Sequence, residues 1–178
     1  DVYKRQAYLW RLEHRGHNWN LIMTAPVRPF ALYAAKFCAM AKMAFLTQGW
    51  LLVLFLVGGK LGAGLAGFPP PEILLWLLRG AVGGLPIIAI QLLLSMVIRN
   101  FALPVLMALG GSILGLMATT SNAGLFWPYS LMLMGMNSNR TEDVMTGQLP
   151  GFFMSCIIFL AIFLLTADAI LAKQDVKA

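Results

Sequence analysis

The chain has 178 residues, of which 60% are hydrophobic and only 11% are charged, and its mean hydropathy is +0.78. An ordinary soluble domain carries about 25% charged residues, so this composition excludes a protein that covers its own surface with polar side chains in water. The net charge is +6. Its basic residues form no patch interleaved with aromatic residues, as a nucleic-acid surface requires, so we expect no nucleic-acid partner.

The N-terminal region divides into two parts. Residues 1–6 resemble a translated sequencing-library adapter, and we exclude them from the fold; a short natural basic arm is the alternative. In the segment 7–28, aromatic and charged side chains alternate, and the apolar positions can share one face of a helix that bends near Gly16. This pattern predicts an amphipathic segment at the membrane surface with Trp19 at headgroup level. Pro26 ends it.

Four long apolar stretches dominate the remaining residues, 29–178, which we expect to form a transmembrane domain. A helix rises about 1.5 Å per residue, so roughly 20 apolar residues cross the hydrocarbon core of a bilayer. The predicted fold class is therefore an all-α, polytopic helical bundle with about four spans. The expected spans are residues 30–58, 73–98, 101–120 and 151–172.

A further apolar stretch, at about 122–137, is too short for a full span and has Pro128 in its middle. Stretches of this length are more often re-entrant or interfacial than spanning. We therefore predict a helical hairpin on the outward side, between the third and fourth spans.

The basic side chains predict the orientation in the membrane. Lys36 and Lys42, in the first half of the first span, are expected to snorkel towards the cytoplasm. The Gly- and Pro-rich stretch 58–71 carries only Lys60 and is placed on the opposite side. By the positive-inside rule, this predicts a multi-pass membrane protein with a cytoplasmic C-terminus. The inner side collects Arg11, Arg15, Arg28, Arg99, Lys173 and Lys177, and the outer side has Lys60, Arg79 and Arg140.

No pattern for catalysis, metal binding or a cofactor is present in the sequence. Glu13, His14 and His17 have the wrong order and spacing for the His-Glu-x-x-His zinc pattern, so we interpret them as a solvated helix face. Cys38 and Cys156 lie inside apolar runs and are interpreted as small buried residues. A phosphate-binding loop is missing as well, so the chain does not hydrolyse ATP by itself.

Polar side chains at membrane depth are functional candidates by default. Gln48 lies in the first span, Gln91 in the second, and Asp168 near the inner end of the last span. The simpler interpretation is interhelical hydrogen bonding for the two glutamines. For Asp168 it is a solvated charge at a helix end, close to Lys173.

Small residues recur at a spacing that allows close packing of helices in lipid. Gly80 and Gly84 form one small-xxx-small pair, and Gly111 and Gly115 form another. Each pair is a candidate helix contact. The alternative is that glycine is simply common in membrane helices.

Several short strings lie in the N-terminal third and before the last span. They are Leu-Glu-His-Arg-Gly at 12–16, Trp-Asn-Leu-Ile at 19–22, Ala-Pro-Val-Arg at 25–28, Ala-Lys-Phe at 35–37 and Phe-Trp-Pro-Tyr at 126–129. Together they resemble ABC-2-type permease subunits, and in particular the lantibiotic and bacteriocin self-protection permeases.

The resemblance implies a coupling helix over about 13–24 that docks into a separate ABC ATPase subunit, with Glu13, Arg15, Gly16 and Trp19 in contact. It also implies a location in the bacterial plasma membrane, a second permease subunit, identical or related, and an amphipathic peptide or lipid-like cargo. Such permeases have six spans, so the first two are expected to be missing here, in agreement with the adapter-like start.

Two other functions remain open from the residues alone. A membrane-embedded lipid-modifying enzyme needs carboxylates or histidines that converge at one depth. Glu142 and Asp143 lie in a loop and Asp168 on the other side in the predicted topology, so they do not converge. A transporter that works without ATP needs an ion relay inside the membrane, and only Gln91 and Asp168 are available for it.

Overall fold

The computed structural model describes residues 28–64, 66–98, 100–138, 143, 145 and 147–175. Every regular element within these residues is helical, and four helices are long and apolar enough to cross a membrane. The predicted fold class is thereby confirmed. The long helices are α3 (Pro29–Val57), α4 (Glu72–Val97), α5 (Ala102–Thr120) and α7 (Leu149–Asp175), and the short elements are η1 (Gly58–Gly62), η2 (Gly124–Phe126) and α6 (Leu131–Gly135).

The two ends of α3 follow from local chemistry. Pro29 is the first helical residue, where its fixed φ suits the helix and its missing N–H would have no intrahelical partner. At the other end, Gly58 keeps a right-handed helical conformation, and the chain continues as the π-helical turn η1 to Gly62. The sequence had placed this stretch in a loop. Continuing the helix gives its backbone groups intrahelical partners, which an apolar solvent favours.

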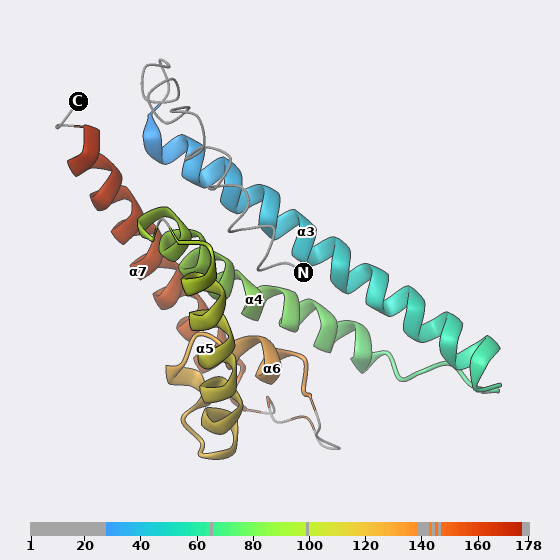
Figure 1. Cartoon of the computed structure of the whole chain (residues 1–178). Coiled ribbons are helices and arrows are strands. Elements are labelled where there is room, and N and C mark those ends of the chain that lie inside the picture. The colour runs from blue at the N-terminus through green and yellow to red at the C-terminus, as the bar shows by residue number, and fades with distance from the viewer. Residues whose placement is uncertain are drawn as a thin grey trace.

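Helix α4 lies at the centre of the bundle, in contact with α3, α6 and α7 (Figure 1). In the most apolar 18-residue stretch of α4, half of the residues are buried, compared with 22% or less in the corresponding stretches of the other three long helices. Pro86 lies inside α4 and is itself buried. The neighbouring helices enclose the position where Pro86 removes a backbone hydrogen bond, which is how membrane helices tolerate proline.

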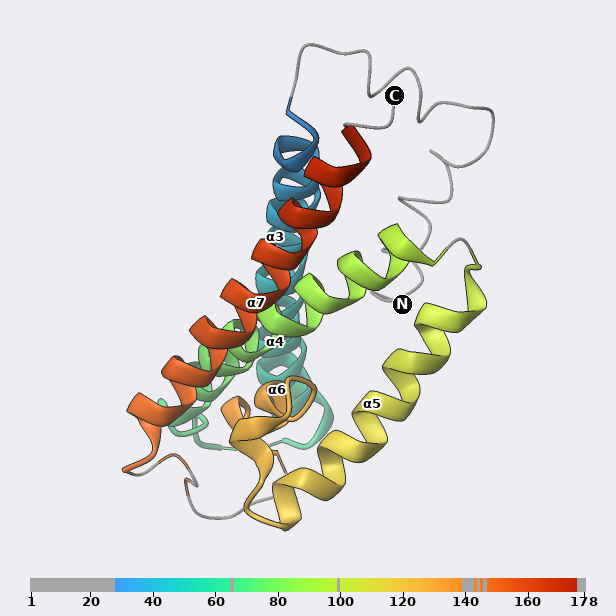
Figure 2. The same cartoon turned by 90° about the vertical axis from the view of Figure 1, so that its left-hand side faces the viewer.

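One end of the bundle has a three-helix core. The start of α3 and the end of α7 lie together there (Figure 2). Tyr33 is fully buried, and its hydroxyl donates a hydrogen bond to the carbonyl oxygen of Ala89 at 2.8 Å. The other buried members of this cluster are Met40, Ile88, Leu92, Met96, Ala167 and Leu171.

At the opposite end, residues 121–148 join α5 to α7, and we call this segment the α5–α7 connector. It contains η2 and α6 and packs against all three of α4, α5 and α7 (Figure 2). Leu131 and Met145 of the connector are fully buried with Phe152 of α7, while Tyr129 packs with Ile87 of α4 and Ala108 of α5.

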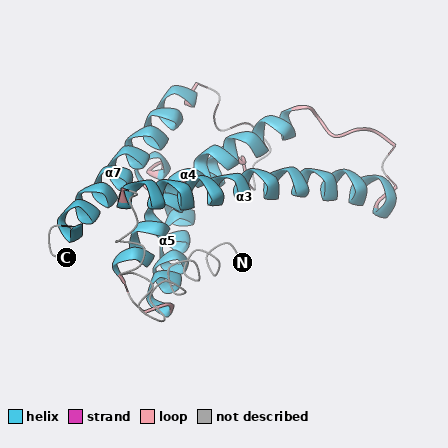
Figure 3. Ribbon diagram, turned by 90° about the horizontal axis from the view of Figure 1, so that it is seen from above, coloured by secondary structure: helices cyan, strands magenta, loops and turns pink. Residues whose placement is uncertain are grey.

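The outer faces of α3, α5 and α7 are apolar. Large hydrophobic side chains are exposed along all three helices, as expected where lipid replaces water. The last turns of α3 extend beyond the rest of the bundle (Figure 3). In the second half of this helix most side chains are exposed, including Leu46, Trp50, Leu54 and Phe55.

The α5–α7 connector as the candidate functional site

Asparagine and serine side chains set the local path of the connector. Asn122, just after α5, and Asn137, just after α6, adopt positive φ values of 58° and 51°. Asparagine tolerates this left-handed conformation better than most residues, so it can end a helix in this way. Between them, the hydroxyl of Ser130 donates to the carbonyl oxygens of Gly124 and Trp127, which ties the two short helical turns together.

Two hydrogen bonds attach the middle of the connector to α4 and α5. The amide nitrogen Nε2 of Gln91, on α4, donates to the hydroxyl oxygen of Tyr129 at 2.6 Å, and both side chains are buried. The indole nitrogen of Trp127 donates to the backbone carbonyl of Gly111, on α5, at 2.9 Å. A Cβ atom added at Gly111 would lie 2.7 Å from the Tyr129 ring, and one at Gly115 would lie 3.0 Å from the Tyr129 carbonyl carbon.

Helix α6 approaches α4 so closely that only glycine fits at the contact. A Cβ atom at Gly83 would lie 2.5 Å from the carbonyl oxygen of Leu131, and one at Gly135 would lie 2.6 Å from that of Arg79. Of the predicted pair, Gly80 faces the Met136 side chain, whereas Gly84 has no atom nearer than 3.9 Å. Gly83 and Gly135 were not predicted as helix contacts from the sequence. The Gly-Gly dipeptide at 83–84 was the available signal for the first of them.

An ion pair attaches the far part of the connector to the beginning of α4. The guanidinium Nη2 of Arg79 and the indole Nε1 of Trp76 both donate to Oδ2 of Asp143, at 2.8 and 3.2 Å. The other carboxylate oxygen, Oδ1, accepts the backbone N–H of Met145 at 2.9 Å. Arg79 is only 4% exposed and Asp143 is 29% exposed.

These contacts determine the charge state of Asp143. Partial burial by itself raises the pKa of this carboxyl group, but the hydrogen bonds from Arg79, Met145 and Trp76, together with the Arg79 charge, outweigh burial and hold the pKa below its ordinary value. From the sequence alone, Asp143 is expected only as part of a loop. Nothing in residue spacing connects position 143 to position 79.

Both glutamines chosen from the sequence face the connector. Gln48, on α3, is 6% exposed, and its Nε2 contacts the sulfur of Met136 at 3.5 Å, while its Oε1 has no hydrogen-bond partner. Gln91 contacts Tyr129 as described above. Asp168 is exposed on α7, close to Lys173 and far along the chain from the connector. The connector thus contacts both glutamines, Gly80 and the pair Gly111 and Gly115, but not Asp168.

The residues predicted to form the coupling helix lie outside the described part of the chain. For Glu13, Arg15, Gly16 and Trp19, the assignment therefore stays a prediction. Of the two lysines expected to snorkel, Lys42 is exposed, whereas Lys36 is buried. Across the described residues, no three His, Cys, Asp or Glu side chains gather where they could hold a metal ion.

An all-helical bundle with four apolar spans and lipid-facing outer surfaces defines a polytopic membrane protein. The family profile of the ABC-2 family transporter proteins matches residues 5–115, which is more than half of the chain and includes α3, α4 and most of α5. The chain belongs to this family and is the membrane permease component of an ABC transporter, a component that is not an enzyme and that pairs with an ATPase subunit. Neither the curated proteins nor the solved structures gave a significant match.

Proposed function

We propose that this permease subunit expels an amphipathic, bacteriocin-like peptide or a lipid-like molecule from the membrane, powered by a separate ATPase subunit. Family membership supports the ATP-driven transport, and the short strings at 12–16, 19–22, 25–28, 35–37 and 126–129 support the peptide-protection subgroup. The apolar outer faces of α3, α5 and α7 favour a cargo that reaches the protein through the bilayer rather than through water.

The observation that carries the mechanism is the attachment of the connector to three helices at once. Gln91, Gly111 and Arg79 contact it through hydrogen bonds, and Phe152 of α7 packs against it. A tilt of α4 therefore moves the connector and α5 with it. Closure of two ATPase subunits on ATP would push the segment 13–24, tilt the helices as rigid bodies and open the connector end of the bundle.

The orientation follows from the distribution of charge. The positive-inside rule places the beginning of α3 and the end of α7 in the cytoplasm and the connector on the outer side. Closing the ATPase subunits requires two permease subunits, so we propose a dimer with a second copy or a related permease.

Co-purification with the ATPase subunit tests the coupling assignment. In the full-length protein, Glu13→Ala with Arg15→Ala should lower ATPase association and cargo-stimulated ATP turnover by roughly tenfold or more, as expected when central contacts of an interface are removed. Glu72→Ala is the control, because it removes an exposed carboxylate at the beginning of α4, outside the segment 13–24. Unchanged association in the double variant would sink the assignment.

Survival of cells challenged with a pore-forming amphipathic peptide tests the cargo class. Protection should require both the permease and an ATPase subunit that can hydrolyse ATP. Protection that persists with an inactive ATPase would instead favour a transporter that works without ATP. Changed lipid composition without any transport would favour the lipid-modifying enzyme.

A further inference from the structure

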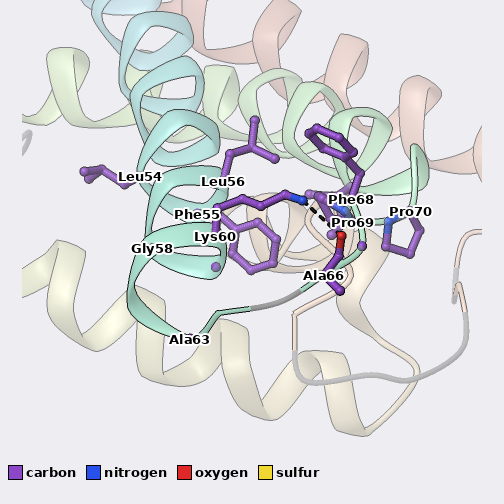
Figure 4. Close-up of a pocket in the computed structure, with 13 residues that line it drawn as sticks. Leu54, Phe55, Leu56, Gly58, Lys60, Ala63, Ala66, Phe68, Pro69 and Pro70 are labelled. Carbon is purple, nitrogen blue, oxygen red and sulfur yellow. Dashed lines mark hydrogen bonds between the residues drawn. The ribbon is translucent and has the colours of Figure 1, made fainter.

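The chain forms an open cavity of about 710 Å³ where α3 ends and α4 begins (Figure 4). Its walls come from the last turns of α3, from η1, from the following loop and from the first turn of α4. Most of the lining is apolar, with Leu54, Phe55, Phe68, Pro69 and Ile73 among the lining residues. An apolar concave surface of this size, next to lipid, accommodates part of an amphiphile.

One cation lies in this apolar setting. The ammonium group of Lys60 donates a hydrogen bond to the carbonyl oxygen of Ala66 at 3.2 Å and lies 4.3 Å from the centre of the Phe68 ring (Figure 4). Neither partner carries a negative charge, and no carboxylate of the described residues forms an ion pair with Lys60. A lysine has three N–H donors, so the group retains capacity for an anionic oxygen.

The depth of Lys60 matches the level of lipid headgroups. Residues 43–59 carry no charged side chain, and the helix is continuous from Lys42 to Lys60. At about 1.5 Å per residue it rises roughly 27 Å between the two lysines, which is close to the hydrocarbon thickness of roughly 30 Å. When Lys42 lies at one interface, Lys60 lies near the phosphates of the opposite leaflet.

We propose that this cavity holds one anionic phospholipid, with its phosphate on the Lys60 ammonium group and its apolar part along Leu54, Phe55 and Ile73. The cation disfavours a positively charged peptide in the same place, so the occupant is a resident lipid rather than a cationic cargo. The inference goes beyond the proposed transport function, because lipid binding needs neither the ATPase subunit nor a cargo.

Lipid retention by the purified full-length protein tests this site. The protein is exchanged into mixed micelles of phosphatidylglycerol and phosphatidylcholine, and bound lipid is counted by native mass spectrometry. We expect a preference for phosphatidylglycerol that falls about fivefold in Lys60→Gln, the factor for one basic side chain at an anionic membrane surface. Lys60→Arg should keep the preference. Lys42→Gln is the matched control, an exposed lysine on the same helix that does not line this cavity.

Several results would overturn the proposal. If Lys60→Gln and Lys42→Gln reduce the preference for phosphatidylglycerol equally, the general surface charge and not this cavity attracts the lipid. If the unaltered protein retains both lipids equally, the charge of Lys60 does not contribute to binding. Displacement by millimolar inorganic phosphate would indicate a plain anion site, and displacement by a cationic amphipathic peptide would indicate a cargo pocket. The lipid preference of the unaltered protein needs no variant, so it tests the site even if Lys60→Gln fails to fold.

Discussion

Gln91 and Tyr129 meet through a 2.6 Å hydrogen bond between two buried side chains, one in the middle of α4 and one in the α5–α7 connector. The same tyrosine ring lies against Gly111, so a single residue joins the connector to two helices. Because α5 has few other contacts with α4, this junction determines where α5 sits.

Tyr129→Phe should therefore destabilise the bundle, because it leaves the buried Gln91 amide without its acceptor. The expected loss is about 1 kcal/mol, within the range for hydrogen bonds between membrane helices. Thermal unfolding in detergent, followed by circular dichroism, measures it.

The double variant Tyr129→Phe with Gln91→Leu is the control for that prediction. Removing both partners leaves no buried polar group unsatisfied, so the double variant should be more stable than Tyr129→Phe alone. If the stability lost in the double variant equals the sum of the losses in Tyr129→Phe and Gln91→Leu measured separately, the hydrogen bond does not stabilise the bundle.

The ion pair between Arg79 and Asp143 should respond unequally to loss of each partner. Asp143→Asn leaves a cation that is 4% exposed without its counter-charge, whereas Arg79→Met leaves a carboxylate that is 29% exposed and can be hydrated. Asp143→Asn should therefore lower the free energy of unfolding more than Arg79→Met does, by roughly 1–3 kcal/mol relative to the unaltered protein. The comparison of midpoints in a denaturant titration decides it, and an equal or reversed order would contradict the contacts described here.

The same ion pair makes stability depend on pH in the acid range. The folded-state pKa of Asp143 lies below its ordinary value of 3.8, so the ionised carboxylate stabilises the folded protein fully above that value. This stabilisation is lost as the pH falls through the lowered pKa. The stability difference between the unaltered protein and Asp143→Asn should be constant from neutral pH to about 5 and shrink below 4. A difference that is the same at pH 3 and pH 7 would rule out this linkage.

Adjacent glycines on α4 should tolerate alanine very differently. A Cβ at Gly83 meets the backbone of Leu131 at 2.5 Å, which cannot move without displacing α6. At Gly84 the nearest atom is the sulfur of Met132, at 3.9 Å. Gly83→Ala should lower the unfolding temperature, whereas Gly84→Ala should keep or raise it, because alanine favours the helix by about 1 kcal/mol. Cysteine crosslinking between α4 and α6 reports whether the contact survives, and a neutral Gly83→Ala would show that the two helices lie further apart.

The four spans were predictable because hydrophobicity along the chain is a local property and lipid leaves the backbone few other choices. Runs of roughly 20 apolar residues become helices, since every backbone polar group must find a partner inside the segment. The same requirement explains why the helix continues to Gly62, where the sequence predicted a loop from residue 58. The glycines at 58 and 59 have the composition of a loop, yet continuing the helix keeps their backbone groups paired.

Contacts between distant segments were not predictable from spacing. The small-xxx-small rule marked Gly80 and Gly84, but the backbone of α6 comes closest to α4 at Gly83. The spacing of glycines within α4 carries no information about where a later segment of the chain crosses it. A glutamine was recognisable as a polar group at membrane depth, whereas its partner Tyr129 was hidden in a short aromatic string.

By itself, the sequence determined that the chain belongs in a membrane and where its four long apolar helices lie, because each depends only on the composition of a short stretch of residues. Only the tertiary structure decided that residues 121–148 fold back between α4, α5 and α7, that Asp143 neutralises Arg79 and that Lys60 lies over Phe68 in an apolar cavity. These pairs are 64 and 8 residues apart in the chain. The docking of whole helices brings Arg79 and Asp143 together, whereas Lys60 and Phe68 meet where the chain turns from α3 into α4.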